Sequence, residues 1–273
     1  VGFVILAIIN HKLFKMKKLL ITLLITLPLS LSAQYAIVDF FVLNEGMEEE
    51  YIALEELWQI YHQNTIDNGD KIFWSVWKRE SKEDDGEFAA HYVTINQFAS
   101  MEDLENENKN FDFEKVVSSI KSSMKGKMSS RKIDKILNVE TKKQMRRYVL
   151  RLNDATPLQG SIELGDVMKG SAMIKKDNDY EQYESNVAKL YFQDNIKKGN
   201  LRWWAFTEII ERSEDAYDDL THFTWSIRVQ GTKMEKDYSL FGNKFTWDKL
   251  SELVSNSRDV KGSNKLTLIM KAN

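Results

Sequence analysis

The sequence predicts an α+β fold: two tandem β-α-β-β-α-β units packed sheet to sheet. A helical run, a glycine and an aromatic strand extend from Gly46 to Trp77, and the same order recurs about 130 residues later, from 177 to 206. A repeat of this length indicates a duplicated domain rather than the shorter repeats of a solenoid. The chain is therefore expected to contain two copies of one unit.

Two adjacent tryptophans, Trp203 and Trp204, predict how the two sheets are arranged. Neighbouring residues of a strand point to opposite faces of a sheet, so one indole faces the helices and the other cannot. Phe73 and Trp74 repeat this arrangement in the first unit. Because burying an aromatic side chain contributes about 2–3 kcal/mol, the second face needs a cover. The simplest cover is the sheet of the other unit, packed face to face, which makes the chain a pseudo-dimer.

The first unit, residues 34–153, is predicted from its apolar patterns. Its long helix begins with the acidic residues 48–50, carries apolar side chains at three- and four-residue spacing, and ends at Gly69. A charged loop joins the two central strands, which indicates a hairpin. The predicted strands are 36–43, 71–79, 88–98 and 147–152, and the predicted helices are 47–68, 101–104 and 113–137, the last with a serine-rich middle.

The second unit, residues 166–273, repeats this order. Its predicted strands are 167–175, 201–210, 222–230 and 265–271, and its predicted helices are 180–198 and 246–256. The segment 154–165 between the units contains Pro157 and two glycines, a composition typical of a linker.

Residues 1–33 are predicted to be an upstream extension followed by a secretory signal peptide. Met16 is followed by two lysines, a short apolar run and small residues before Gln34. The apolar run is too short for a good spanning helix, so no stable membrane span is expected after cleavage. We interpret Met16 as the true start and the protein as exported, to the periplasm or outside the cell. The alternative is that residues 1–15 form an uncleaved amphipathic anchor.

Composition and motifs exclude several classes of function. The chain has no cysteine and four histidines, one of which precedes Met16, so we expect no metal site and no cofactor. It lacks the nucleophile elbow of serine hydrolases, the His-Glu-x-x-His motif, the phosphate loop and the dinucleotide fingerprint. Nucleic acid is not an expected partner of an exported protein that has no recognition motif.

Positive charge is concentrated between Lys115 and Arg147, where eleven basic and two acidic residues give a local charge of +9. Removing residues 1–33, which hold four lysines and no acidic residue, changes the net charge of the chain from −3 to −7. A basic helix beside acidic domains could contact an anionic lipid or a polysaccharide. The alternative is a solvated helix whose field complements the acidic remainder.

The chain also resembles a known group of proteins. The duplicated order of elements is similar to the dimeric α/β-barrel group of ferredoxin-like folds, here in a single-chain, pseudo-dimeric form. More narrowly, it resembles secreted bacterial proteins of unknown role, through Gly46, Met47, Tyr51, Glu55, Trp58, His62, Gly69, Trp74 and the strand 92–94. Glu45 stands where that set usually has proline. The wider group includes small monooxygenases, haem-degrading enzymes and domains with no known chemistry, so the resemblance implies a pocket between helices and sheet but no reaction.

Four residues of the first unit form the candidate site. Glu55, Trp58 and His62 are spaced i, i+3 and i+7, which places them on one helix face, towards the sheet that carries Trp74. A carboxylate, an indole and an imidazole in an apolar cleft could orient a ligand or transfer a proton. The structural alternative is that Trp58 belongs to the core and that Glu55 and His62 pair at the helix edge. The corresponding residues of the second unit are Ser185, Ala188 and Phe192. The site is therefore expected in the first unit alone.

We consider three functions for this site and its surroundings. The first is a non-catalytic module that binds a small, largely apolar ligand through Trp58, Trp74 and their polar neighbours. The alternative is an enzyme, a cofactor-poor monooxygenase or isomerase that uses the same pocket, with His62 or Glu55 as the base. The third is a surface protein that binds a partner through its basic helix. A strongly shifted pKa of Glu55 or His62 would favour the enzyme.

Overall fold

Eight antiparallel strands close into one barrel within residues 34–273, the part of the chain that the computed structural model describes. The predicted signal peptide, the extension 1–15 and the start at Met16 lie outside these residues. The elements are β1 (Tyr35–Leu43), α2 (Glu48–Asp67), β2 (Phe73–Arg79), β3 (Tyr92–Phe98), α3 (Met101–Asn110), α4 (Phe113–Ser123), α5 (Ser130–Leu137), β4 (Lys142–Ala155), β5 (Val167–Lys175), α6 (Tyr180–Tyr183), η1 (Glu184–Ala188), α7 (Lys189–Lys197), β6 (Leu201–Arg212), β7 (His222–Arg228), η2 (Tyr238–Phe241), α8 (Lys244–Asn256) and β8 (Arg258–Ala272).

The two halves of the chain arrange their strands in the same order. Around the barrel the first half contributes β4-β1-β3-β2 and the second β8-β5-β7-β6. β2 then pairs with β8 and β4 with β6, in both cases antiparallel. The barrel that the resemblance implies is confirmed as one closed antiparallel barrel. The two sheets are joined along their edges as well as facing each other, because each sheet edge finds its hydrogen-bond partners in the other half. The fold is α+β, with helices around one antiparallel barrel.

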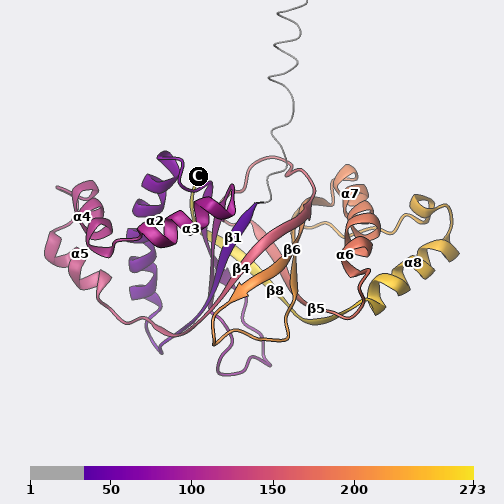
Figure 1. Ribbon diagram of the computed structural model, residues 1–273, viewed down its shortest axis with the longest axis horizontal. Helices are drawn as coiled ribbons and strands as arrows, with labels where there is room; N and C mark the ends of the chain where they lie inside the picture. The colour runs from indigo at the N-terminus through magenta and orange to yellow at the C-terminus, as the bar shows by residue number, and fades with distance from the viewer. Residues whose placement is uncertain (1–33) are drawn as a thin grey trace, which may run out of the picture. The chain divides into compact units, whose positions relative to one another are not determined.

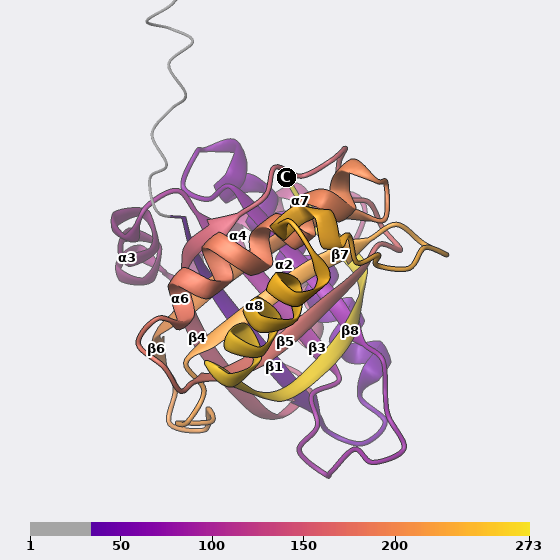
Figure 2. The same cartoon turned by 90° about the vertical axis from the view of Figure 1, so that its right-hand side faces the viewer.

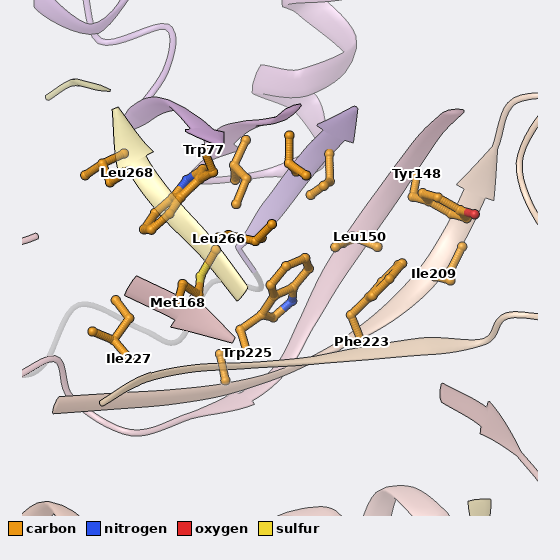
Figure 3. Packing of buried hydrophobic residues seen from close by; sticks show 14 of the residues in the cluster. Trp77, Tyr148, Leu150, Met168, Ile209, Phe223, Trp225, Ile227, Leu266 and Leu268 are labelled. Carbon is orange, nitrogen blue, oxygen red and sulfur yellow. The ribbon is translucent and has the colours of Figure 1, made fainter. Parts of the chain in front are cut away.

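The bulky rings on opposite faces of one strand fill two different layers. Trp204 is fully buried on the outer face of the barrel, where its indole stacks on a helix residue, Phe192. Trp203 points inwards and packs against the apolar interior of the barrel. That interior is drawn in Figure 3, where side chains from both halves meet. The inner faces of the two halves therefore cover each other, although their edges are joined.

Helices lie on two opposite sides of the barrel. Those of the first half, α2 to α5, are on one side, and α6, α7 and α8 are on the other (Figure 1). Figure 2 shows these last three helices in front of the strands. The long helix of each half ends at a glycine with positive φ, +83° at Gly69 and +75° at Gly199, a conformation that favours glycine. Within residues 34–273 no helix is long and apolar enough to cross a membrane.

Two predicted helices are interrupted. The helix expected at 113–137 is two helices, because α4 ends before Gly126, which has a φ of +80°, and Ser129 then caps α5. The helix expected at 180–198 contains η1, a π-helical turn that inserts one extra residue. The basic stretch 115–147 is consequently not one helix, since its last residues, from Lys142, belong to β4.

Candidate functional site

A cavity of about 350 Å³ lies between α2, α3 and the outer faces of β1 to β4. Glu55, Trp58, His62 and Trp74 all line it, so the structure brings the four candidate residues of the sequence together. α2 supplies the first three from one face, because its stripe of buried residues turns the same face to the barrel. The cavity lies in the first half of the chain.

Aromatic rings form one wall of the cavity. The His62 ring stacks on Trp74, with ring centroids 4.8 Å apart and planes at 24°. Trp58 lies 6.1 Å from His62 between centroids, and Phe111, which is 46% exposed, lies beyond it. Trp74, 1% exposed, lies buried beneath His62, so the rings stack one on another, and those that remain at least partly exposed are Trp58 and Phe111.

A buried lysine stands behind the histidine. Lys71, just before β2, is 3% exposed. Its Nζ lies 2.8 Å from His62 Nδ1, 3.0 Å from Asn96 Oδ1 and 2.9 Å from Glu107 Oε1. An ammonium group has three N–H donors and no acceptor, and three acceptors surround this one. Lys71 is therefore the charged form, although burial lowers its pKa, because the carboxylate of Glu107 acts in the opposite direction.

This contact determines the tautomer of His62. Because Nδ1 accepts a hydrogen bond from Lys71, the ring proton is on Nε2. Burial, together with the charge of Lys71, holds the pKa of His62 well below its usual value, so the ring stays neutral. Among residues 34–273 no group accepts a hydrogen bond from Nε2. His62 is therefore a hydrogen-bond donor through Nε2 at the cavity, rather than the base that the sequence analysis considered.

Glu55 provides the carboxylate of the site, two helical turns from His62. It is 3% exposed, and Lys142 Nζ lies 3.3 Å from its Oε1. Burial raises the pKa of Glu55, and Lys142 acts in the opposite direction. Beside it, burial and then the charge of Glu55 raise the pKa of Tyr51 well above its usual value. A carboxylate whose pKa is raised above its usual value is a stronger base than an exposed one, which suits proton transfer.

The second half contains a corresponding group of three residues. Glu184 is 1% exposed, and its Oε1 lies 2.6 Å from Arg258 Nη1. Tyr180, fully buried, is beside this pair, and burial raises the pKa of both Tyr180 and Glu184. The tyrosine, the glutamate and the cation thus occur in both halves, which indicates that they help to hold each long helix on its strands.

The π-helical turn hid this correspondence in the sequence. Glu55 and Glu184 are 129 residues apart, whereas His62 and Phe192 are 130 residues apart. When the two halves are aligned at a constant offset of 130 residues, Ser185 and not Glu184 corresponds to Glu55. The expectation that the second half lacks the whole polar set is therefore wrong for the glutamate.

What the second half does lack is the lysine–histidine cluster. Phe192 stacks on Trp204, with centroids 5.3 Å apart and planes at 16°, as His62 stacks on Trp74. The ladder pairs of the equivalent tryptophans place Ser226 where the first half has Asn96. The histidine of the first half is thus replaced by phenylalanine in the second, and the asparagine by a shorter serine, in an otherwise similar fold.

Several residues of the site were not identified from the sequence. Asp39 is 4% exposed and accepts two hydrogen bonds from Arg147, at 2.7 and 2.9 Å. That contact raises the pKa of Arg147. The signal for Asp39 was its position as the one charged residue of an apolar strand. For Lys71 no signal was present, because a lysine at the start of a strand is ordinarily exposed.

Comparisons with known proteins support the fold. No family model matches the chain, and a search of curated proteins finds no match. A solved structure of a candidate monooxygenase from Lactobacillus acidophilus NCFM has a TM-score of 0.50 at 12% identity, covering 88% of this chain and 96% of that chain. A second candidate monooxygenase, from Fusobacterium nucleatum, has a TM-score of 0.52 at 9% identity, covering 89% and 96%. At these identities the likeness shows the fold alone.

These findings correct the first function considered from the sequence. A non-catalytic module for a small apolar ligand is wrong: both structural neighbours are described as candidate monooxygenases, and the cavity holds a buried ammonium, an imidazole and carboxylates beside its aromatic wall. The enzyme that was the alternative is better supported.

Proposed function

We propose that the protein is a monooxygenase that needs no bound cofactor and acts in the cavity between α2 and the barrel. The observation that carries the proposal is the contact of Lys71 with His62 Nδ1, which leaves the Nε2–H of His62 without an acceptor among residues 34–273, in a cavity lined by aromatic rings. A donor polarised by a buried cation stabilises negative charge on a substrate oxygen. The likeness to two candidate monooxygenases supports the same class of reaction.

The substrate class follows from the electron balance. Without a cofactor the substrate must supply all four electrons that reduce O₂. A methylene group conjugated through aromatic rings with a ketone does so when it becomes a carbonyl: the carbon loses two hydrogens and gains one oxygen atom, and the second oxygen atom leaves as water. The step begins with loss of one C–H proton, which gives an enolate. We therefore infer a flat, fused-ring ketone with an acidic methylene.

Each site residue has a role in this reaction. Glu55 takes the C–H proton, for which its raised pKa is suited. His62 donates from Nε2 to the enolate oxygen, Trp58 packs against the substrate rings, and Trp74 supports His62 from behind.

Oxygen uptake with anthrone as the substrate tests the proposal. We expect the protein to accelerate uptake, with anthraquinone as product and one O₂ consumed per molecule. His62→Gln removes the polarised imidazole, and we expect the rate to fall about a hundredfold, the typical effect of losing one such donor. Proton exchange at the methylene without oxygen uptake would indicate an isomerase and overturn the proposal, as would a rate equal to that without protein.

We also infer that the barrel is two fused ferredoxin-like units, residues 34–153 and 166–273, joined by 154–165. The common strand order of the halves and their paired tyrosine–glutamate–cation groups support this. In this view the second unit lost, or never gained, the polar cluster.

A further inference from the structure

A second cavity lies at one end of the barrel, away from the site described above. It has a volume of about 420 Å³. The loops between β2 and β3 and between β6 and β7 border it, and both are at the lower end of the barrel in Figure 1. Neither these loops nor the cavity has a part in the proposed oxidation.

Arg146 of β4 lines this cavity from the inner face of the barrel. Its neighbour Arg147 points outwards and is paired with Asp39. Alternation along the strand puts Arg146 on the same side as Tyr148 and Leu150, which belong to the barrel interior. Arg146 is only 6% exposed.

In the described part of the chain, residues 34–273, the guanidinium of Arg146 has no anionic partner. Its Nη1 donates to Gln144 Oε1 at 3.0 Å and its Nη2 to the carbonyl of Phe88 at 2.8 Å, and both acceptors are neutral. Among residues 34–273 no carboxylate lies within 4.0 Å of it, whereas the other buried arginine of this cavity, Arg79, is paired with Asp85. Burying an arginine without a counter-ion costs several kcal/mol. The ring of Tyr217, with its centroid 5.1 Å from Arg146 Cζ, balances this charge only in part. The remaining charge is one that an anion from outside can balance.

The other charges around the cavity leave this positive charge in excess. Arg79 is balanced by Asp85, and Lys261 lies 3.0 Å from Asp219. The lining therefore carries a net charge of +1, which matches a monoanion. A guanidinium presents parallel N–H donors that fit the two oxygens of a carboxylate.

The remainder of the lining is apolar. Phe223 stacks on Phe40 at 5.9 Å and meets the edge of Tyr148 at 5.3 Å between centroids; Tyr148 and Phe223 are labelled in Figure 3. At the rim Phe88 and Tyr217 are 48% and 55% exposed. The hydroxyl of Tyr148 accepts a hydrogen bond from the Tyr217 backbone at 3.0 Å and keeps its own hydrogen to donate.

From these observations we propose that the barrel mouth is a binding site for an organic monocarboxylate with an apolar body. The carboxylate pairs with Arg146 and the body lies on the aromatic floor. The volume lies within the range of small-molecule sites. This proposal does not depend on the oxidation proposed for the other cavity.

Isothermal titration calorimetry with 1-naphthoate and with octanoate tests this site. We expect at least one of them to bind the wild-type protein, and the corresponding neutral amide not to bind. Arg146→Met should weaken binding at least tenfold, and Arg146→Lys should have an intermediate effect, because an ammonium does not form the bidentate contact. The matched control is Arg151→Met, on the same strand but outside the cavity, and it should bind as the wild type does.

Thermal unfolding provides a second measurement. The carboxylate should raise the Tm of the wild-type protein and leave that of Arg146→Met unchanged. If neither probe binds the wild-type protein, or if Arg146→Met binds as tightly as Arg151→Met, the proposal is wrong.

Discussion

Leu201 occupies, in the second half of the barrel, the position that Lys71 occupies in the first. Lys71 lies just before β2, which carries Trp74, and Leu201 begins β6, which carries Trp204. Leu201 is 2% exposed and Lys71 is 3% exposed. An apolar residue thus fills this place without loss of the fold. A buried ammonium is costly to keep where a leucine would serve, so its presence in one half indicates a chemical role.

The first prediction concerns the tautomer of His62. At neutral pH, nitrogen-15 NMR of the imidazole should show a neutral ring with the proton on Nε2, because Lys71 donates to Nδ1. Replacing Lys71 by Met should remove this preference and give a mixture of tautomers. A wild-type ring with its proton on Nδ1, or a charged ring, would contradict the arrangement on which the proposed function depends.

Glu55 and Glu184 form a matched pair for mutagenesis. We expect Glu55→Gln and Glu184→Gln each to lower the free energy of unfolding by roughly 1–3 kcal/mol, because each leaves a cation without its partner. Only Glu55→Gln should lose oxygen uptake with anthrone. Urea unfolding and an oxygen electrode provide the two measurements. Equal activity of the two variants would exclude Glu55 as the base.

The pH dependence of that activity tests the same residue. Burial raises the pKa of Glu55 above 4.5, and the base must be deprotonated to act. The acidic limb of kcat/KM should therefore lie above pH 4.5 and be absent from whatever activity Glu55→Gln retains. An acidic limb at or below pH 4.5 would show that an ordinary exposed carboxylate, or none, is involved.

His222 predicts a loss of stability in acid. Burial lowers its pKa from 6.5 to about 4, and Glu181, with its carboxylate 3.4 Å from Nε2, acts in the opposite direction. Between these values the unfolded chain binds a proton that the folded protein does not, so stability falls as the pH falls from 6.5 to 4. Relative to His222→Phe, the wild-type protein should lose up to roughly 3 kcal/mol over this range. Urea unfolding at several pH values measures the difference in unfolding free energy between the two proteins. A difference that does not change with pH would contradict the prediction.

The sequence predicted the repeated order of elements because that order depends on local patterns. The helix face of Glu55, Trp58 and His62 was predictable from spacing, and the inward and outward tryptophans from strand alternation. Closure of the barrel was expected from the resemblance to the dimeric α/β-barrel group and not from the residue pattern, since the pairing of β2 with β8 depends on strand edges almost 200 residues apart in the chain. Pairing across that distance leaves no local pattern.

The polar half of the site was hidden for a different reason. Lys71 contacts groups from α2, α3 and β3, and only the folded chain brings those together. Glu184 was missed because a single inserted residue in η1 shifts the repeat by one. Arg146 and Arg147 were counted together in one basic stretch, and the predicted strand began only at Arg147. In the structure both belong to β4, on opposite faces.

The central claim is that the lysine–histidine cluster of the first half serves chemistry and not folding. The most direct test gives the first half the residues of the second: His62→Phe, Lys71→Leu and Asn96→Ser, with Glu107→Gln to remove the carboxylate left without its partner. We predict a Tm equal to or above that of the wild-type protein, because apolar side chains replace a buried ion pair, and oxygen uptake with anthrone no faster than without protein. A variant that is folded and still active within twofold of the wild type, or one that no longer folds, would contradict the claim.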